Sequence, residues 1–228
     1  MTARRSSILL ALAFLFAPLG ARGAPATPAP IPSTAEQAFL ATMMRDLPRL
    51  YPTPAAAQAA GYVRYTNEDT TGAISYVNVA DWDSPDVDHP AQLWYDVRGG
   101  LLGADYSVRQ ADAPNGPPAL FGLDPKRFFT IRAHVHYVTC NHATMHCTYG
   151  KAVGATRYAT VGDPAHPTPD GLVKLGVVTD PGSVATVFLY QAIYDVSVWV
   201  VPNPLGQFAE TNPAVTPSPN AGKGEDSM

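Results

Sequence analysis

Residues 186–201 read TVFLYQAIYDVSVWVV, the most apolar stretch of the chain after its N-terminal segment. β-Branched and aromatic residues dominate this stretch, and Pro202 follows it directly. Residues of these types favour strands, whereas a proline cannot donate a hydrogen bond to a neighbouring strand. We therefore predict that the second half of the stretch forms a central strand of a sheet.

Outward from this stretch, apolar and polar residues alternate with the period of a strand from Tyr62 onward. Helical patterns come earlier, over residues 34–46 after a capping box of Ser33 and Glu36, and again from Pro54 up to Gly61. This order predicts an α+β fold, with N-terminal short helices followed by a mainly antiparallel β-sheet or a partly closed β-barrel. The other predicted strands are residues 62–65, 73–79, 92–97, 101–108, 128–140, 146–153 and 172–178.

Residues 1–23 have the three parts of a secretory signal peptide. Two arginines precede an apolar run over residues 8–17, and small residues stand at Ala21 and Gly23. The apolar run is too short to span a bilayer, which requires about 20 residues. We therefore predict cleavage before Ala24 and a secreted or periplasmic protein with no membrane anchor.

The rest of the chain divides into three segments by composition. Residues 24–32 (APATPAPIP) predict an extended linker, because proline and alanine offer few side chains that can pack. Residues 33–211 predict a single β-rich domain, since they contain no internal repeat and are short for two domains. The Pro, Ser, Gly and charged residues of 212–228 predict a disordered tail.

Charge limits the classes of partner. Without residues 1–23 the chain keeps 12 basic and 19 acidic side chains, a net charge of −7. Nucleic acids require a basic face, so we predict no nucleic-acid partner. A small molecule or a metal remains the expected partner, and the sequence leaves open whether the chain forms an oligomer.

The two cysteines of the chain, Cys140 and Cys147, are seven positions apart. In an oxidising compartment such a pair predicts a local disulfide. The enclosed loop is short, so the disulfide is expected to stabilise the fold by only about 2–3 kcal/mol.

Four of the six histidines accompany these cysteines, namely His134, His136, His142 and His146. His134 and His136 share one face if they lie on a strand, and a hairpin would bring His142 or His146 alongside. Three imidazoles suit Cu or Zn, so a metal site is one hypothesis for this segment. The alternative is a disulfide-closed surface hairpin whose histidines are solvated or paired with carboxylates.

A second group of polar residues consists of Asp81, Asp83, Asp86 and Asp88, which we expect in a loop between strands. Spaced carboxylates can bind Ca²⁺ through oxygen ligands. Their spacing does not match the EF-hand loop and the glycine required at its turn is missing, so an exposed acidic turn is the favoured interpretation.

Several segments occur in an order that resembles a family of uncharacterised bacterial exported proteins, classified only as a domain of unknown function. The resemblance covers about residues 47–215, and it rests on the ordered set rather than on one specific motif. The segments are AQAAGYV (57–63), ISYVN (74–78), PAQLWY (90–95), LLGADY (101–106), PALFG (118–122), YDVSVW (194–199), NPLGQF (203–208) and NP (212–213).

The family pattern places a His before Tyr-x-Asn, a Glu before a Tyr and a His before Val-Trp. Inward-facing His and Glu on neighbouring strands imply a metal or catalytic pocket in that family. This chain has Ser75, Asp105 and Ser197 at those positions. The resemblance therefore implies a pocket whose chemistry is lost or changed, and it implies no activity, because the family has none assigned.

Three hypotheses of function follow. The favoured one is an exported small binding or structural protein of unknown ligand, because no catalytic constellation is complete. The second is a Cu or Zn binding protein, with or without enzyme activity, acting through residues 134–147. The third is a metal-free hydrolase or lyase that uses a strand-borne Asp with Tyr or Ser. The candidate pocket residues are Ser75, Tyr76, Asp105, Asp195 and Ser197.

Overall fold

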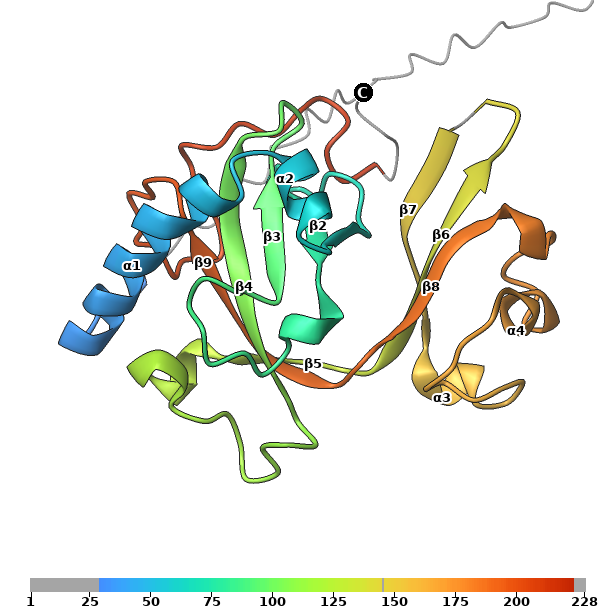
Figure 1. Ribbon diagram of the computed structural model, residues 1–228, viewed down its shortest axis with the longest axis horizontal. Helices are drawn as coiled ribbons and strands as arrows, with labels where there is room; N and C mark the ends of the chain where they lie inside the picture. The colour runs from blue at the N-terminus through green and yellow to red at the C-terminus, as the bar shows by residue number, and fades with distance from the viewer. Residues whose placement is uncertain (1–28, 145, 224–228) are drawn as a thin grey trace, which may run out of the picture.

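The computed structural model describes residues 29–144 and 146–223 (Figure 1). The predicted signal peptide and the first part of the predicted linker lie outside the described residues. The helices are α1 (Thr34–Leu50), α2 (Pro54–Ala59), α3 (Ala155–Tyr158) and α4 (Pro169–Lys174). The strands are β1 (Val63–Arg64), β2 (Ile74–Val77), β3 (Gln92–Tyr95), β4 (Leu101–Arg109), β5 (Phe129–Ile131), β6 (His134–Asn141), β7 (His146–Gly154), β8 (Val184–Tyr190) and β9 (Ile193–Trp199).

The strands form two antiparallel sheets, which confirms the α+β fold, and the described residues contain no closed barrel. The larger sheet has six strands in the order β1-β2-β3-β4-β9-β5, and the smaller has the order β7-β6-β8. Residues 186–201 contribute to both, because β8 belongs to the small sheet and β9 to the large one. Because β9 lies between β4 and β5, the predicted central strand is confirmed.

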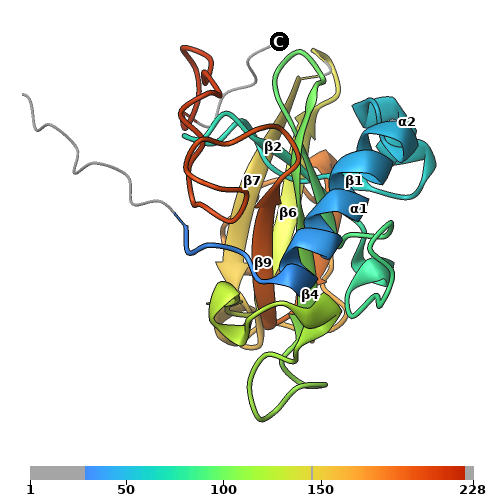
Figure 2. The ribbon, with the colours of Figure 1, turned by 90° about the vertical axis from the view of Figure 1, so that its left-hand side faces the viewer.

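One face of the large sheet packs against α1. Phe39, Met43 and Leu47 of this helix are buried in a core with residues such as Leu93 and Val198. Figure 2 shows α1 on this side of β4 and β9, with the C-terminal segment on the other. Since side chains alternate across a strand, residues next to the core residues point to the side away from α1.

Helix α1 begins as predicted and ends later than predicted. Ser33 and Glu36 form the capping box, with the Ser33 amide donating to Glu36 Oε2 at 2.8 Å and the Glu36 amide to Ser33 Oγ at 3.2 Å. The helix continues through Pro48 to Leu50 instead of ending near residue 46. Pro48 lies in the last turn, and Leu47 beside it is fully buried, so packing outweighs the cost of the proline there.

The strand predicted over residues 172–178 is wrong, because helix α4 occupies its first part. Thr168 caps this helix by accepting a hydrogen bond from the Gly171 amide at 3.2 Å, and Pro169 holds the first helical position. These two residues form a helix start that the apolar pattern alone does not reveal. Leu172 then packs into the core of the small sheet beside Tyr158.

The prediction that residues 212–228 form a disordered tail needs correction as far as residue 223. The Ser218 amide donates to Glu68 Oε1 at 2.7 Å, and the Gly222 amide donates to the Glu68 carbonyl at 2.9 Å. Asn212 is buried and donates through Nδ2 to the Pro202 carbonyl at 3.1 Å. Polar contacts therefore hold a segment whose composition resembles that of a disordered chain.

Part of the predicted linker also contacts the domain. The Ala29 amide donates to the Leu205 carbonyl at 2.8 Å, and Arg127 donates through Nη2 to the Pro30 carbonyl at 3.0 Å. Both terminal segments thus lie against the large sheet on the side away from α1. Among the described residues, no helix combines the length and the apolar character needed to cross a membrane.

Candidate functional site

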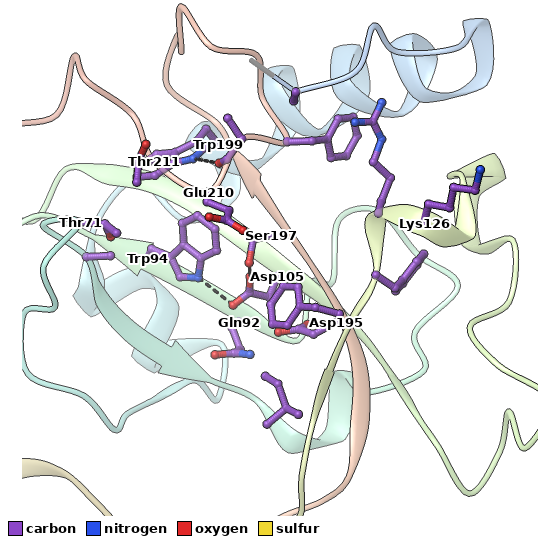
Figure 3. A pocket seen from close by; sticks show the side chains of 18 of the residues that line it. Thr71, Gln92, Trp94, Asp105, Lys126, Asp195, Ser197, Trp199, Glu210 and Thr211 are labelled. Atoms are coloured by element: carbon purple, nitrogen blue, oxygen red, sulfur yellow. Dashed lines mark hydrogen bonds between the residues drawn. The ribbon is translucent and has the colours of Figure 1, made fainter. Parts of the chain in front are cut away.

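A cavity of about 1290 Å³ opens on the face of the large sheet that lies opposite α1 (Figure 3). Strands β2, β3, β4, β5 and β9 form its floor. The loop before β2, the stretch 124–128 and the two terminal segments 29–33 and 208–211 form its walls. The cavity volume is large enough for a small organic molecule.

Two Asp-x-Ser pairs, Asp105 with Ser107 and Asp195 with Ser197, lie on the adjacent strands β4 and β9, and all of them except Ser107 line the cavity. Strands β4 and β9 run antiparallel, so Asp105 stands opposite Ser197 and Ser107 opposite Asp195. Ser197 Oγ donates to Asp105 Oδ1 at 2.7 Å, and Ser107 Oγ donates to Asp195 Oδ1 at the same distance. Each carboxyl group therefore accepts a hydrogen bond from the serine of the neighbouring strand.

Trp94 provides the second hydrogen bond to Asp105. Its Nε1 donates to Asp105 Oδ2 at 2.9 Å, which Figure 3 shows as a dashed line. The indole lies over Gly103, where an added Cβ would come within 2.5 Å of Trp94 Cε3 and 2.6 Å of the Val198 carbonyl oxygen. Only glycine leaves the space for this arrangement. Trp199 meets Trp94 edge-on, with ring centroids 5.5 Å apart.

A hydrogen-bonded group of three side chains closes the floor toward the small sheet. Gln92 stands opposite Asp105 in the strand pairing. Its Oε1 accepts a hydrogen bond from the Tyr65 hydroxyl, and its Nε2 donates to the Tyr190 hydroxyl at 2.7 Å. All three residues are buried and line the cavity.

The central carboxyl groups are buried without a cation beside them. Asp105 is 6% exposed and Asp195 is 1% exposed. Burial raises the pKa of Asp105 to about 7, although hydrogen bonds from Ser197 and Trp94 act in the opposite direction. Burial, together with the nearby Asp105, raises the pKa of Asp195 well above its usual value. The pair therefore retains a proton near neutral pH.

A third buried carboxyl group of the same cavity, Glu36, has the opposite environment. Arg127 donates to Glu36 Oε1 at 2.9 Å through Nε, and its guanidinium lies 4.4 Å from the ring centroid of Phe208. These three residues all line the cavity near its edge. The hydrogen bond from Arg127 is the largest cause that lowers the pKa of Glu36 to about 2.

Four of the five predicted pocket residues come together at this site. Ser75, Asp105, Asp195 and Ser197 line the cavity. Tyr76 instead points to the opposite face, where it packs in the core covered by α1. The reason is the strand alternation, since Ser75 and Tyr76 are neighbours on β2 and cannot face the same side.

The prediction missed Ser107, Gln92 and Trp94, which complete the hydrogen bonding of the floor. The repeated Asp-x-Ser pattern at residues 105–107 and 195–197 is a sequence signal that could have found Ser107. It becomes informative only once the two strands are known to pair antiparallel. No comparable signal marks Gln92 or Trp94, because their role depends on the register of β3 against β4.

The predicted disulfide is confirmed, but the predicted metal ligands do not converge. Cys140 and Cys147 are bonded across β6 and β7. His134 stacks on Tyr190 at 4.8 Å between ring centroids, and the buried His136 packs against aromatic rings. His142 Nε2 lies 2.7 Å from the Gly182 carbonyl oxygen.

His146, the fourth predicted ligand, is exposed. Within residues 29–144 and 146–223 no group of three or more His, Cys, Asp or Glu is placed to hold a metal ion. The rings of His134 and His136 are neighbours, with centroids 5.7 Å apart, but His142 contacts Gly182 instead of joining them. The hypothesis of a Cu or Zn site on this hairpin therefore lacks the third ligand that it requires.

Three of the four aspartates in residues 81–88 have separate partners, and the fourth, Asp88, has a buried Oδ1 with no hydrogen-bond partner among the described residues. Asp81 accepts a hydrogen bond from Asn78 Nδ2 at 2.7 Å, Asp83 pairs with Arg109, and Asp86 accepts from the Asp88 amide at 2.9 Å. These carboxylates shape the loop, and they do not surround a common point as calcium ligands would.

Comparisons with known proteins add no assignment: no family model, curated protein or solved structure matches this chain. The resemblance to an exported family of unknown function stays a prediction. The site must therefore be interpreted from its own chemistry.

Proposed function

We propose that this protein binds a small organic molecule in the cavity of the large sheet. The observation that supports this function is the pairing of a cavity of about 1290 Å³ with buried hydrogen-bonding groups on its floor. Binding sites for small molecules combine apolar walls with a few placed polar groups. Here Trp94 and Trp199 provide the apolar surface, and Asp105, Asp195 and Gln92 provide the polar groups.

The three tryptophans offer a test that needs no knowledge of the natural ligand. Trp94 and Trp199 line the cavity, whereas Trp82 lies outside it. We expect members of a library of small organic fragments, at millimolar concentration, to shift the indole N–H resonances of Trp94 and Trp199 and leave that of Trp82 unchanged. If no fragment moves Trp94 or Trp199, or if all three move equally, the binding function is contradicted.

Two substitutions of the same kind sharpen the test. Thr71 lines the cavity, whereas Thr130 lies between Phe129 and Ile131 on β5 and points away from it. Thr71→Phe should weaken the binding of fragments by reducing the cavity volume, and Thr130→Phe should leave binding unchanged. Equal effects of the two variants would show that the fragments bind elsewhere.

A metal-free hydrolase or lyase is the second candidate function, and one observation favours it. A carboxyl group with a pKa of about 7, as in Asp105, is suited to proton transfer at neutral pH. If the protein is such an enzyme, Asp105→Asn should remove turnover of chromogenic esters or glycosides. Equal turnover by the wild type and the variant would exclude Asp105 as the acid–base group.

We propose further that the protein is exported. The Cys140–Cys147 disulfide supports export, because such bonds persist in oxidising compartments. The sequence of residues 1–23 supports it independently. N-terminal sequencing of the product from its native host should begin at Ala24. A product that retains residue 1 and has both cysteines reduced would contradict export.

A further inference from the structure

The charged groups that line the cavity are mainly acidic. Asp105 and Asp195 lie at its centre, and Figure 3 shows Glu210 extending toward them from the C-terminal segment. The two cations, Lys126 and Arg127, belong to the stretch 124–128 at one side, and Arg127 is paired with Glu36. No ion pair of the described residues involves Asp105 or Asp195.

The side chains that line the cavity beside these carboxyl groups are aromatic. Trp94 and Trp199 stand along one side of the cavity, and Phe129 borders the other from β5, directly opposite Asp195 in the strand pairing. Aromatic faces attract cations through the negative charge above the ring, and they also bury apolar groups. These aromatic side chains therefore suit a molecule that has both an apolar body and a positive charge.

One side chain of the protein, that of Arg127, already has such an acidic and aromatic environment. The guanidinium of Arg127 lies between the Glu36 carboxylate and the Phe208 ring at the edge of the same cavity. Asp105 and Asp195 have aromatic neighbours too, but their cation is missing from the chain itself. In the free protein a retained proton neutralises the pair in part, and a cationic ligand is an alternative source of compensating charge.

Resting on the proposed binding function, we propose that the ligand is an organic cation, such as an amine or a quaternary ammonium compound. Its charged group lies against Asp105 and Asp195, and its apolar body lies along Trp94 and Trp199. Ser197 and Ser107 hold the two carboxyl groups in place by donating to them, and these hydrogen bonds remain available to the ionised forms.

Binding is then coupled to proton release. The carboxyl pair retains a proton in the empty cavity near neutral pH, and the cation takes the place of that proton, which passes to the solvent. Affinity should therefore rise with pH up to the pKa of the pair. The other titratable or charged groups that line the cavity are Tyr65, Tyr190, Asp69, Asp124, Glu210, Glu36, Lys126 and Arg127.

Three of these groups, Glu36, Tyr65 and Tyr190, do not change their charge between pH 5.5 and 7.5. The pKa of Glu36 is lowered to about 2, and burial raises the pKa values of Tyr65 and Tyr190 further above 10. His134 stacks on Tyr190, and His136 packs on Tyr65, so both histidines contact lining residues from the small sheet. Substitution of Asp105 and Asp195 is therefore the step that assigns a pH dependence in this range to the carboxyl pair.

Isothermal titration calorimetry with benzyltrimethylammonium tests the proposal, because the charge of this probe does not change with pH. Between pH 5.5 and 7.5 the affinity should rise by about tenfold or more, since up to one proton must leave for each cation bound. Titration of the released protons in unbuffered solution should find up to one per cation. Benzyl alcohol and benzoate should bind at least about tenfold more weakly at pH 7.5.

Two variants assign the effect to the floor of the cavity. Asp195→Asn and Asp105→Asn should each weaken binding of the cation about tenfold and reduce its pH dependence, whereas Asp170→Asn, at an exposed position of α4, should change neither. Circular dichroism would verify that each variant is folded.

The proposal is overturned if benzyl alcohol or benzoate binds as tightly as the cation. It is also overturned if the affinity for the cation changes neither with pH nor in the two variants. In either case the cavity would still bind small molecules. Failure of all three probes to shift Trp94 or Trp199 would instead contradict the proposed binding function itself.

Discussion

Two carboxyl sites line the same cavity, and they differ in whether the chain provides a cation. At the edge, Glu36 is paired with Arg127, and its pKa is lowered to about 2. At the centre, Asp105 receives hydrogen bonds from Ser197 and Trp94 but no cation, and its pKa is raised to about 7. Hydrogen bonds from neutral donors therefore do not offset burial here, whereas an ion pair does.

The difference has opposite consequences for stability. A buried carboxylate with its cation in place supports folding at neutral pH, whereas a buried carboxyl group without one opposes ionisation of the folded protein. At the edge of the cavity the chain therefore provides its own cation, whereas at the centre the described residues provide none. The following variants test each half of this comparison.

The largest effect is expected from Arg127→Gln, which leaves Glu36 buried without its cation. The side chains of this pair are only 9% and 3% exposed. Breaking such a pair should lower the free energy of unfolding by about 3 kcal/mol at pH 7, as measured by urea denaturation. Arg98→Gln is the matched control, because Arg98 pairs with Asp96 while 87% exposed, and its loss should cost less than about 0.5 kcal/mol.

The same pair also predicts how the free energy of unfolding changes at acidic pH. Because the pKa of Glu36 is lowered, its ionised carboxylate stabilises the folded state at pH values above 4.5, the usual pKa of a glutamate. This contribution is lost as the pH falls from 4.5 toward 2. Arg127→Gln should flatten the dependence of the unfolding free energy on pH in this interval. An unchanged pH dependence, or equal losses in Arg127→Gln and Arg98→Gln, would contradict the account of the edge.

Asp105→Asn is expected to act in the opposite direction. Because the folded protein keeps the proton of Asp105 up to a pKa of about 7, the wild type should lose stability as the pH rises from about 4 to 7. The loss is on the order of 3 kcal/mol. Asparagine cannot ionise, so the variant should be more stable than the wild type at pH 8 and nearly equal to it at pH 4.

Urea denaturation at both pH values measures this difference, with Asp170→Asn as the control that should show none. A variant that is less stable than the wild type at pH 8 would mean that the Asp105 carboxylate is compensated in the free protein. The centre of the cavity would then resemble its edge.

Gly103→Ala tests the support of the centre. The added Cβ would lie 2.5 Å from Trp94 Cε3 and 2.6 Å from the Val198 carbonyl oxygen, and the backbone atom cannot easily move. We expect a loss of about 2 kcal/mol and displacement of the Trp94 indole from Asp105. Gly154→Ala is the control, since nothing lies within 4 Å of a Cβ at that position. An unchanged Trp94 N–H resonance in Gly103→Ala would count against this geometry.

The smallest effect at the cavity should follow removal of the disulfide by Cys140→Ala together with Cys147→Ala. The bond encloses a short loop at the tip of β6 and β7, so its loss should cost about 2 kcal/mol. Neither cysteine lines the cavity, so cation binding should stay unchanged. A matching loss of binding would show that the hairpin participates in the site.

The sequence predicted the parts of the fold that depend on local patterns. The capping box of Ser33 and Glu36, the alternation of β2 to β4 and the central position of β9 are all visible as spacings of residue types. The helix α4 was missed because its start depends on Thr168 and Pro169, while the residues that follow look equally suited to a strand. Local apolar runs do not distinguish these cases without the surrounding packing.

The sequence predicted several residues of the candidate pocket but not the hydrogen bonds between them. Ser75, Asp105, Asp195 and Ser197 were expected in one pocket, but the serine–carboxylate exchange between β4 and β9 depends on strand register. The histidines show the converse case. Clustering in sequence at residues 134–146 suggested a metal site. The rings of His134 and His136 do lie near each other, but His142 and His146 do not join them, because nearness along a hairpin does not orient all side chains toward one point.

The most direct test of the account is an NMR titration of the side-chain carboxyl carbons of Asp105 and Asp195 in the ligand-free protein, using aspartate labelled with carbon-13. We predict that Asp105 titrates near pH 7 and that Asp195 titrates well above the usual range of aspartates. If both carboxyl groups titrate below about pH 4.5, like ordinary aspartates, then the centre of the cavity is already compensated and the account is contradicted.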